Sequence, residues 1–185
     1  MNLIQAVIMG IVEGVTEFLP ISSTFHLIYT AKLLGIQQND FTKLFEVFIQ
    51  SGAIMSVVFL YAKDLANDRD LVKKTMASFF PTAIVGLALY KIIKNVFFES
   101  DRLMIGVFIG MGLAFIGYEL FLKRWGNRLR NTVGSMTYTD AVLVGFIQSL
   151  AVVPGVSRSG AVILGMMLLR YERAEAARYS FILSI

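Results

Sequence analysis

Residues 13–26 read EGVTEFLPISSTFH and place several reactive side chains inside an otherwise apolar stretch. Glu13 and Glu17 are four residues apart, so on a helix they share one face. A charged carboxylate in hydrocarbon costs at least about 2.5 kcal/mol, and two on one face also repel each other. The pair therefore predicts hydrogen bonds to partner helices, a shared divalent cation, or a proton kept on one carboxyl group for acid–base chemistry. Carboxylates within a membrane usually mark a functional site, which favours the cation or the proton.

Three hydroxyl groups and the one histidine of the chain follow these glutamates. Ser22, Ser23 and Thr24 come soon after Pro20, where a helix is expected to begin, and at least one of them suits an N-cap. His26 lies three residues after Ser23, within reach across one helical turn. A lone histidine is often structural, but a hydroxyl, an imidazole and carboxylates in one pocket can form a nucleophile with its acid–base partners.

A second polar break reads VVPGVSRSGAVI and covers residues 152–163. Arg158 carries a permanent charge and a fork of N–H donors that suits phosphate oxygens. Ser157, Ser159 and the backbone N–H groups from Gly155 onward begin a helix, and a helix start of small residues binds anions. The arginine can also pair with one of the two glutamates when no ligand is bound. An anion site that faces carboxylates and a cation, Mg²⁺ or Ca²⁺, is the arrangement that phosphoryl transfer needs.

The segments around both breaks are too apolar for an ordinary soluble domain. Of the 185 residues, 56% are hydrophobic and 16% are charged, whereas soluble domains have about 25% charged residues. The absence of cysteine excludes disulfides and thiolate metal sites, and a single histidine excludes a multi-histidine metal centre. The net charge of +4 indicates cytoplasmic loops, and no nucleic-acid partner is expected. We expect an all-α, polytopic integral membrane protein.

Three apolar segments have the length of a membrane crossing. Basic residues concentrate in 63–75 and 123–131, and because two crossings separate these segments, both should lie in the cytoplasm. The first crossing then starts outside, where Glu46 and Gln50 form another polar pair that we expect to line the same cavity. The predicted crossings cover residues 44–62, 76–93 and 103–122.

Two other apolar regions each break at a proline that is followed by serines. Helices usually end before proline because its ring clashes with the preceding turn. Each region therefore fits a re-entrant hairpin of two half-helices, with one long kinked helix as the alternative. The expected half-helices cover residues 3–19 with 24–36, and 138–153 with 158–170.

The two broken regions also form an internal repeat. AVIMGIVE aligns with AVLVGFIQ, which places Glu13 over Gln148 and Gly10 over Gly145. The first region leads into a crossing that starts outside, and the second follows a cytoplasmic segment, so the motif enters from opposite faces. Such an inverted-topology repeat places a site near the midplane, where broken helices meet. Gln148 is therefore a further candidate for the pocket.

This repeat sets the expected domain organisation. We expect one membrane domain over residues 1–185, with repeat 1 over about 1–93 and repeat 2 from about 138. The second repeat reaches Ile185 with its last span only begun, so we expect a chain truncated at its C-terminus.

EGVTEFLPISST-x-H followed by PGVSRSG resembles the bacterial undecaprenyl-diphosphate phosphatases, or bacitracin-resistance proteins, in their (E/Q)xxxE and PGxSRSxxT motifs. FEVFIQSGAIMSVVF resembles the family's segment after the first motif, and the resemblance covers essentially the whole chain. It implies hydrolysis of undecaprenyl pyrophosphate to undecaprenyl phosphate and inorganic phosphate at the outer face of the bacterial cytoplasmic membrane. This reaction recycles the lipid carrier for cell-wall synthesis and confers bacitracin resistance.

The resemblance also implies roles for particular residues and a divalent cation, Mg²⁺ or Ca²⁺. Glu13 and Glu17 match the family's essential glutamates, which would hold the cation. Ser23 matches the proposed nucleophile, His26 the family's histidine, and Arg158 the phosphate-binding arginine. The residues that match the surrounding polar shell are Ser22, Thr24, Gly155, Ser157 and Ser159.

The sequence departs from the family pattern at two positions and leaves several alternatives open. Phe25 stands where the family usually has glycine, and Val162 stands where its second motif usually ends in threonine. The attacking group is either Ser23 or water. An inverted-repeat transporter or lipid flippase for isoprenyl phosphates is the alternative function, and a non-catalytic scaffold is a third. The expected partners are an isoprenyl pyrophosphate lipid and the bilayer, with a homodimer as one form of assembly.

Overall fold

The structure is a computed structural model of the chain. It describes residues 1–96, 101–125, 129 and 131–185, and the side chains of these residues except 90–96, 101 and 125. Within the described residues, the regular secondary structure is helical, apart from one isolated bridge between Asn131 and Tyr171. The predicted all-α class is therefore confirmed. The helices are α1 (Leu3–Thr16), α2 (Ser23–Leu33), α3 (Asp40–Asn67), α4 (Arg69–Val96), α5 (Asp101–Trp125), η1 (Val133–Ser135), α6 (Tyr138–Gln148), η2 (Ser149–Val152), α7 (Arg158–Leu168) and α8 (Arg173–Ile182).

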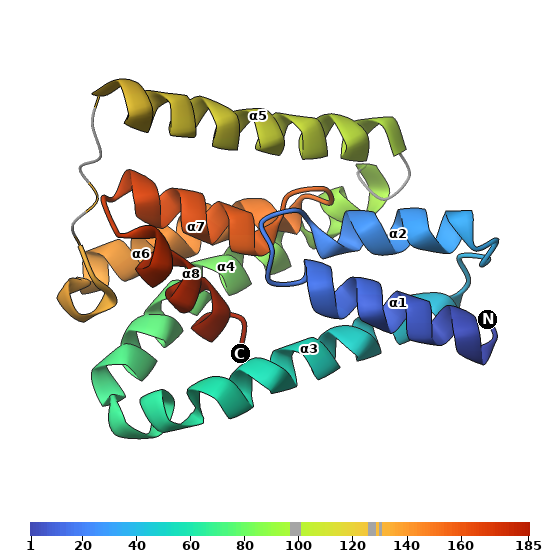
Figure 1. The fold of residues 1–185 in the computed structure, drawn as a ribbon, viewed down its shortest axis with the longest axis horizontal. Helices are drawn as coiled ribbons and strands as arrows, with labels where there is room; N and C mark the ends of the chain where they lie inside the picture. The colour runs from blue at the N-terminus through green and yellow to red at the C-terminus, as the bar shows by residue number, and fades with distance from the viewer. Residues whose placement is uncertain (97–100, 126–128, 130) are drawn as a thin grey trace.

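Two of the three predicted crossings have the length and composition of a membrane span: α3, and residues Arg102–Arg124 of α5. The third, 76–93, lies within α4, a single helix that contains Pro81. The side chains of residues 90–93 lie outside those that the structure describes, so the apolar length of this third crossing stays a prediction. Figure 1 places the turn between α3 and α4 at the same end of the molecule as the C-terminal end of α5, as the distribution of basic residues predicts.

Both proline-containing regions break into separate helices. α1 ends at Thr16 and α2 begins at Ser23, and these two helices pack against each other. α6 ends at Gln148, the short helix η2 follows, and α7 begins at Arg158 and packs against α6. Neither region is one long kinked helix. The re-entry of these pairs from opposite faces of a membrane stays a prediction.

Polar side chains at the helix starts explain where several of these elements begin. Asn2 and Gln5 form a capping box at α1, and Thr137 and Asp140 form another at α6. Asn39 accepts a hydrogen bond from the backbone N–H of Thr42 at the start of α3. Each bond satisfies backbone donors that a helix leaves without partners at its N-terminus.

Helices α4 and α6 pack closely against each other. A Cβ atom on Gly145 would lie 2.1 Å from the carbonyl oxygen of Ser78, so this crossing admits only glycine. The hydroxyl of Ser78 donates to the carbonyl of Ala141 at 2.6 Å and lies 2.7 Å from the hydroxyl of Tyr179. Thr82 donates to the carbonyl of Gly145. Buried polar groups need such partners, and these bonds fix α6 against α4.

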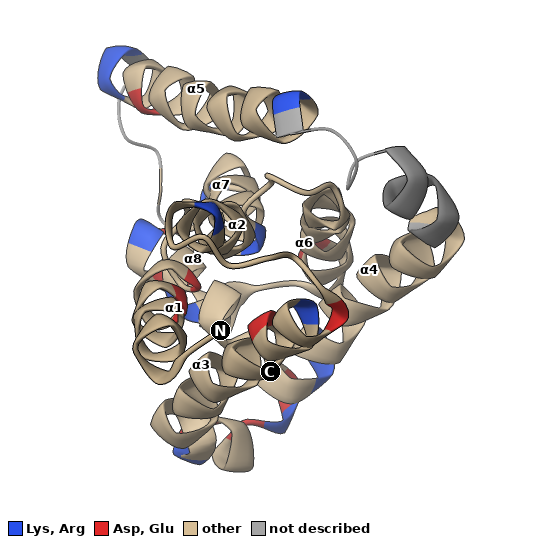
Figure 2. Cartoon of the chain, turned by 90° about the vertical axis from the view of Figure 1, so that its right-hand side faces the viewer, with Lys and Arg blue, Asp and Glu red and all other residues tan. Residues whose placement is uncertain are grey.

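Helix α5 is attached differently, through a few large side chains. In both Figure 1 and Figure 2 it lies above α7 and α2. Figure 2 shows its charged residues toward its two ends. Phe108 stacks on Phe25 of α2 with the ring centroids 4.1 Å apart and the ring planes at 5°. Tyr118 donates to the carbonyl of Met167 at 2.6 Å. Phe25, which departs from the family pattern, thus helps to hold α5 to the first helix pair.

Candidate active site

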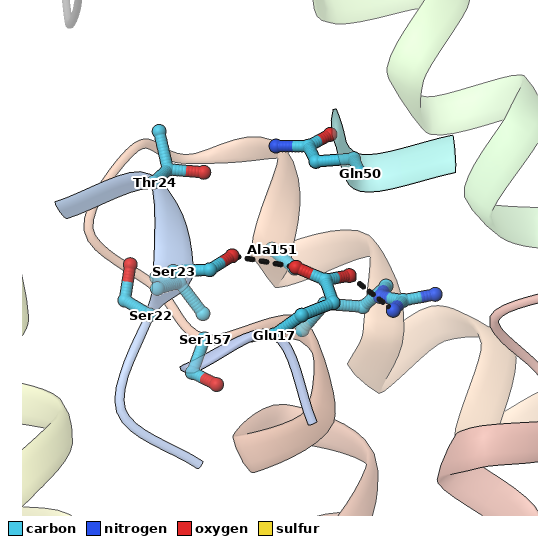
Figure 3. A pocket seen from close by; sticks show the side chains of 9 residues that line it. Glu17, Ser22, Ser23, Thr24, Gln50, Ala151 and Ser157 are labelled. Atoms are coloured by element: carbon cyan, nitrogen blue, oxygen red, sulfur yellow. Dashed lines mark hydrogen bonds and ion pairs between the residues drawn. The ribbon is translucent and has the colours of Figure 1, made fainter. Parts of the chain in front are cut away.

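The two broken regions meet at the carboxylate of Glu17, just after the end of α1 (Figure 3). Its Oε2 accepts a hydrogen bond from the hydroxyl of Ser23 at 2.6 Å. Its Oε1 is 2.7 Å from Nη2 of Arg158 at the start of α7. A single carboxylate thus joins the hydroxyl of one break to the guanidinium of the other. The expected pairing of the arginine with a glutamate occurs, and Glu17 is its partner.

The carbonyl of Leu19 provides a second link between the breaks. It accepts a hydrogen bond from the hydroxyl of Ser159 at 2.9 Å and a longer one from Ser157 at 3.5 Å. The hydroxyl of Ser157 also accepts from the backbone N–H of Gly160, which makes it the N-cap of α7. These bonds hold the start of α7 against the turn that follows Glu17, which fixes the position of Arg158.

A polar cavity of about 190 Å³ opens between these groups. It contains most of the predicted site residues, and Gln50 of α3 lines it as well. Ala151 and Val156 also line it but give no chemical signal in the sequence. The residues around the cavity are Glu17, Ser22, Ser23, Thr24, Gln50, Ala151, Val156, Ser157 and Arg158.

The backbone at this site is unusual at two positions. Ser22 has φ of 61°, a region that residues other than glycine rarely adopt. Ser22 occupies the N-cap position of α2, but its side chain makes no hydrogen bond to the backbone of this helix start. The capping bond expected from one of Ser22, Ser23 and Thr24 is therefore not made by Ser22. Gly155 has φ of 99°, and a Cβ atom there would lie 2.7 Å from the carbonyl of Met104 in α5. The strained backbone leaves the hydroxyl of Ser22 to face the cavity.

Glu13 lies deeper, on the same face of α1 as Glu17. Only 1% of its surface is exposed, and among the described residues neither of its oxygens has a hydrogen-bond partner. A buried carboxylate without partners is expensive, so it requires either a proton or a cation. The described residues contain no group of three or more metal-ligating side chains. Two carboxylates nevertheless suit Mg²⁺, which is often held by one or two carboxylates together with substrate phosphates.

The remaining predicted residues lie around the cavity without lining it. Nδ1 of His26 is 2.8 Å from the carbonyl oxygen of Ser22, and its ring is edge-on to Phe108. Glu46 accepts a hydrogen bond from Gln38, and Gln148 donates to Thr82. Within the described part of the chain, the cavity wall includes none of His26, Glu46 and Gln148.

The two sequence segments that align with each other, around Glu13 and around Gln148, have different surroundings. Gln148 is bonded to Thr82, and Gly145 is pressed against Ser78 of α4. At the aligned positions, Glu13 has no hydrogen-bond partner and Gly10 has no atom within 4 Å of its would-be Cβ, among the described residues. The Gln148 side is therefore occupied by helix packing, whereas the oxygens of Glu13 have no hydrogen-bond partner among the described residues.

Comparison with known proteins agrees with the motifs. The model of the family described as bacitracin resistance protein BacA matches residues 6–185. Proteins named undecaprenyl-diphosphatase from Persephonella marina and Sulfurihydrogenibium sp. are each 48% identical to this chain over 185 residues. Each alignment covers 100% of this chain and 72% of the relative. The protein of the same name from Aquifex aeolicus is 44% identical over 181 residues, which are 98% of this chain and 70% of the relative.

Proposed function

The chain belongs to the bacitracin resistance protein BacA family, and from this premise we propose that it is an undecaprenyl-diphosphatase. It hydrolyses undecaprenyl pyrophosphate to undecaprenyl phosphate and inorganic phosphate. The observation that carries this proposal is the carboxylate of Glu17, held between the hydroxyl of Ser23 and the guanidinium of Arg158. One polar cavity thus contains a candidate base (Glu17), a candidate nucleophile (Ser23) and a guanidinium that can bind phosphate (Arg158).

The geometry supports roles for these three side chains. Arg158 has five N–H donors, so it can remain paired with Glu17 while other donors bind the oxygens of the terminal phosphate. Its charge offsets the charge that develops on the equatorial oxygens in the transition state. Ser23 attacks the terminal phosphorus, a P–O bond forms, and the bond to the bridging oxygen breaks. Glu17, 2.6 Å from the hydroxyl, accepts its proton.

Water then hydrolyses the phosphoserine and regenerates Ser23. If water attacks the phosphorus directly, Glu17 accepts the proton of that water instead. His26 is adjacent to the cavity through the backbone of Ser22 and is the candidate for returning a proton to the leaving oxygen. The hydroxyls of Ser22 and Thr24 face the same cavity and can bind further phosphate oxygens.

The burial of Glu13 supports a divalent cation, Mg²⁺ or Ca²⁺, as a cofactor. Glu13 and Glu17 would hold it, and when bound it would neutralise charge on the substrate phosphates. The proposed cation also accounts for the absence of hydrogen bonds to the Glu13 oxygens among the described residues.

The proposed setting is the bacterial cytoplasmic membrane. The apolar helices α3 and α5 support several crossings, and the lipid substrate requires access from the bilayer. A multi-pass chain built on an inverted repeat, with the cavity open to the outside, would recycle the lipid carrier for cell-wall synthesis. The description of the family as bacitracin resistance proteins supports a role of this activity in resistance to bacitracin. The homodimer stays a prediction.

The proposal can be tested by measuring phosphate release from farnesyl pyrophosphate, the C15 isoprenyl analogue. The assay uses the purified full-length protein. We expect release with Mg²⁺ or Ca²⁺, and its loss in Arg158→Ala and Glu17→Ala. Arg173→Ala is the matched control, because it removes an exposed arginine that pairs with Glu119 on the surface. Absence of release by the wild type, together with lipid movement across liposomes, would support the transporter instead.

A further inference from the structure

A second cavity lies directly beside the polar one and has the opposite character. Its volume is about 150 Å³. Carbon atoms dominate its wall, which is formed by the turn before α2, one face of α5 and the loop before α7. The residues around it are Pro20, Ile21, Ser22, Phe108, Ile109, Met111, Gly112, Gly155 and Ser157.

Ser22 and Ser157 line both cavities, so the two cavities adjoin each other at these serines. Figure 3 shows these two serines together on one side of Glu17. A molecule that extends from Glu17 past the two serines therefore passes from carboxylate and guanidinium groups, through hydroxyls, to an apolar wall. A lipid pyrophosphate matches these surroundings in the same order, because its terminal phosphate is followed by a second phosphate and then by a hydrocarbon chain.

Specific features of the chain keep this second space open. Gly112 contributes no side chain, and a Cβ atom there would have no neighbour within 4 Å among the described residues. The positive φ of Gly155 lets its loop approach the backbone of α5 near Met104. Phe108 is fixed by its stack on Phe25, so the wall is rigid on that side. A cavity of about 150 Å³ lined by apolar side chains is large enough for benzene, and an isoprene unit has one carbon fewer.

We propose that this apolar cavity binds the first isoprene unit of the lipid substrate. The terminal phosphate then lies toward Glu17 and Arg158, and the phosphate esterified to the lipid lies between Ser22 and Ser157. The rest of the lipid's hydrocarbon chain extends along α5, whose outer face is apolar and exposed. The inference rests on the proposed function, and it adds the direction in which the substrate lies and the role of α5.

The substitution Gly112→Leu tests this proposal because it fills the cavity without replacing any polar group. We expect KM for farnesyl pyrophosphate to rise about tenfold or more, since displacing an isoprene unit loses the burial of several methylene-sized groups. Gly110→Leu is the matched control. It lies on the same helix, with equally open space around its would-be Cβ among the described residues, but about 200° around the axis. We expect its KM to stay at the wild-type value.

The outcomes separate this inference from the proposed function. If the wild type releases phosphate but Gly112→Leu leaves KM unchanged, the inference is wrong and the function stands. An equal rise in KM for Gly110→Leu would also overturn the inference, because a leucine outside the cavity would then weaken substrate binding as much as one inside it. If the wild type releases no phosphate, the proposed function itself fails.

Labelling of the wild-type protein provides a test that requires no variant to fold. The probe is farnesyl pyrophosphate that carries a diazirine on its first isoprene unit. After irradiation, we expect mass spectrometry to find the adduct within residues 108–112 of α5. Excess inorganic pyrophosphate should reduce the labelling, because it competes for the polar cavity. Labelling confined to α1 or α3 would overturn the proposal.

Discussion

Ser23 and Glu17 are joined by a hydrogen bond of 2.6 Å, which orients the hydroxyl and provides an acceptor for its proton. We predict that Ser23→Ala lowers the rate of phosphate release by about 100-fold or more, the size of effect that positioned proton transfer contributes. Ser149→Ala is the control, because that hydroxyl donates only to a carbonyl of its own helix turn. Trapping of a phosphoserine in the wild type would identify Ser23 as the nucleophile, whereas full activity of Ser23→Ala would show that water attacks.

Glu13 provides a separate test of the cation. In the wild type without divalent cations, its buried carboxylate is destabilising, so we predict that Glu13→Gln raises the free energy of unfolding by about 1 kcal/mol. Mg²⁺ should stabilise the wild type and leave Glu13→Gln unaffected, as measured by thermal unfolding in detergent. Glu46→Gln, at a glutamate already bonded to Gln38, should keep the response to Mg²⁺. Equal stabilisation of Glu13→Gln by Mg²⁺ would place the cation elsewhere.

Among the helices, Gly145 and Gly10, which occupy aligned positions in the sequence, give opposite predictions. Gly145→Ala places a Cβ atom 2.1 Å from the carbonyl oxygen of Ser78, so α6 must shift away from α4. We expect a loss of about 1–3 kcal/mol in the free energy of unfolding. At Gly10→Ala, the new Cβ atom meets open space among the described residues. We expect this substitution to raise the free energy of unfolding by up to about 1 kcal/mol, because alanine has the higher helix propensity. Equal effects of the two substitutions on thermal unfolding would contradict the observed α4–α6 contact.

The sequence predicts the helix breaks well because their signals are local. A proline followed by serines limits where α1, α2, α6 and α7 can extend, and apolar length indicates α3 and α5. The positive φ of Ser22 carries no such signal, so a serine expected to cap a helix instead faces the cavity. The contact between α4 and α6 depends on a serine and a glycine 67 residues apart (145 − 78), and no periodicity within one segment predicts it.

The same contrast applies to the site. Residue type and the family motifs identify Glu17, Ser23 and Arg158 as site candidates, and the cavity contains all three. The sequence does not decide whether Glu13 or Glu17 pairs with Arg158, and the structure pairs it with Glu17. The carbonyl of Leu19 accepts hydrogen bonds from Ser157 and Ser159 of the second motif. Because it is a backbone group, the residue type at position 19 does not predict this role. Likewise, Phe25 departs from the family pattern, but only the position of Phe108 on α5 explains what it packs against.

At the scale of the whole molecule, the orientation in the membrane can be tested because the chain has no cysteine. Gln38 and Lys73 are both exposed and lie at opposite ends of α3, beyond its N- and C-terminal ends respectively. We predict that a membrane-impermeant maleimide labels Gln38→Cys in intact cells and labels Lys73→Cys only after the membrane is opened. The reverse pattern would contradict the proposed orientation, and with it a cavity that opens to the outside.

In the proposed function, the two broken regions form one site that removes the terminal phosphate of a lipid pyrophosphate. The most direct measurement uses undecaprenyl pyrophosphate with ³²P in its terminal phosphate, added to the full-length protein and to Arg158→Ala. We expect labelled inorganic phosphate from the wild type and none above background from Arg158→Ala. Labelled pyrophosphate as the product, or release that Arg158→Ala leaves unchanged, would contradict the proposed function.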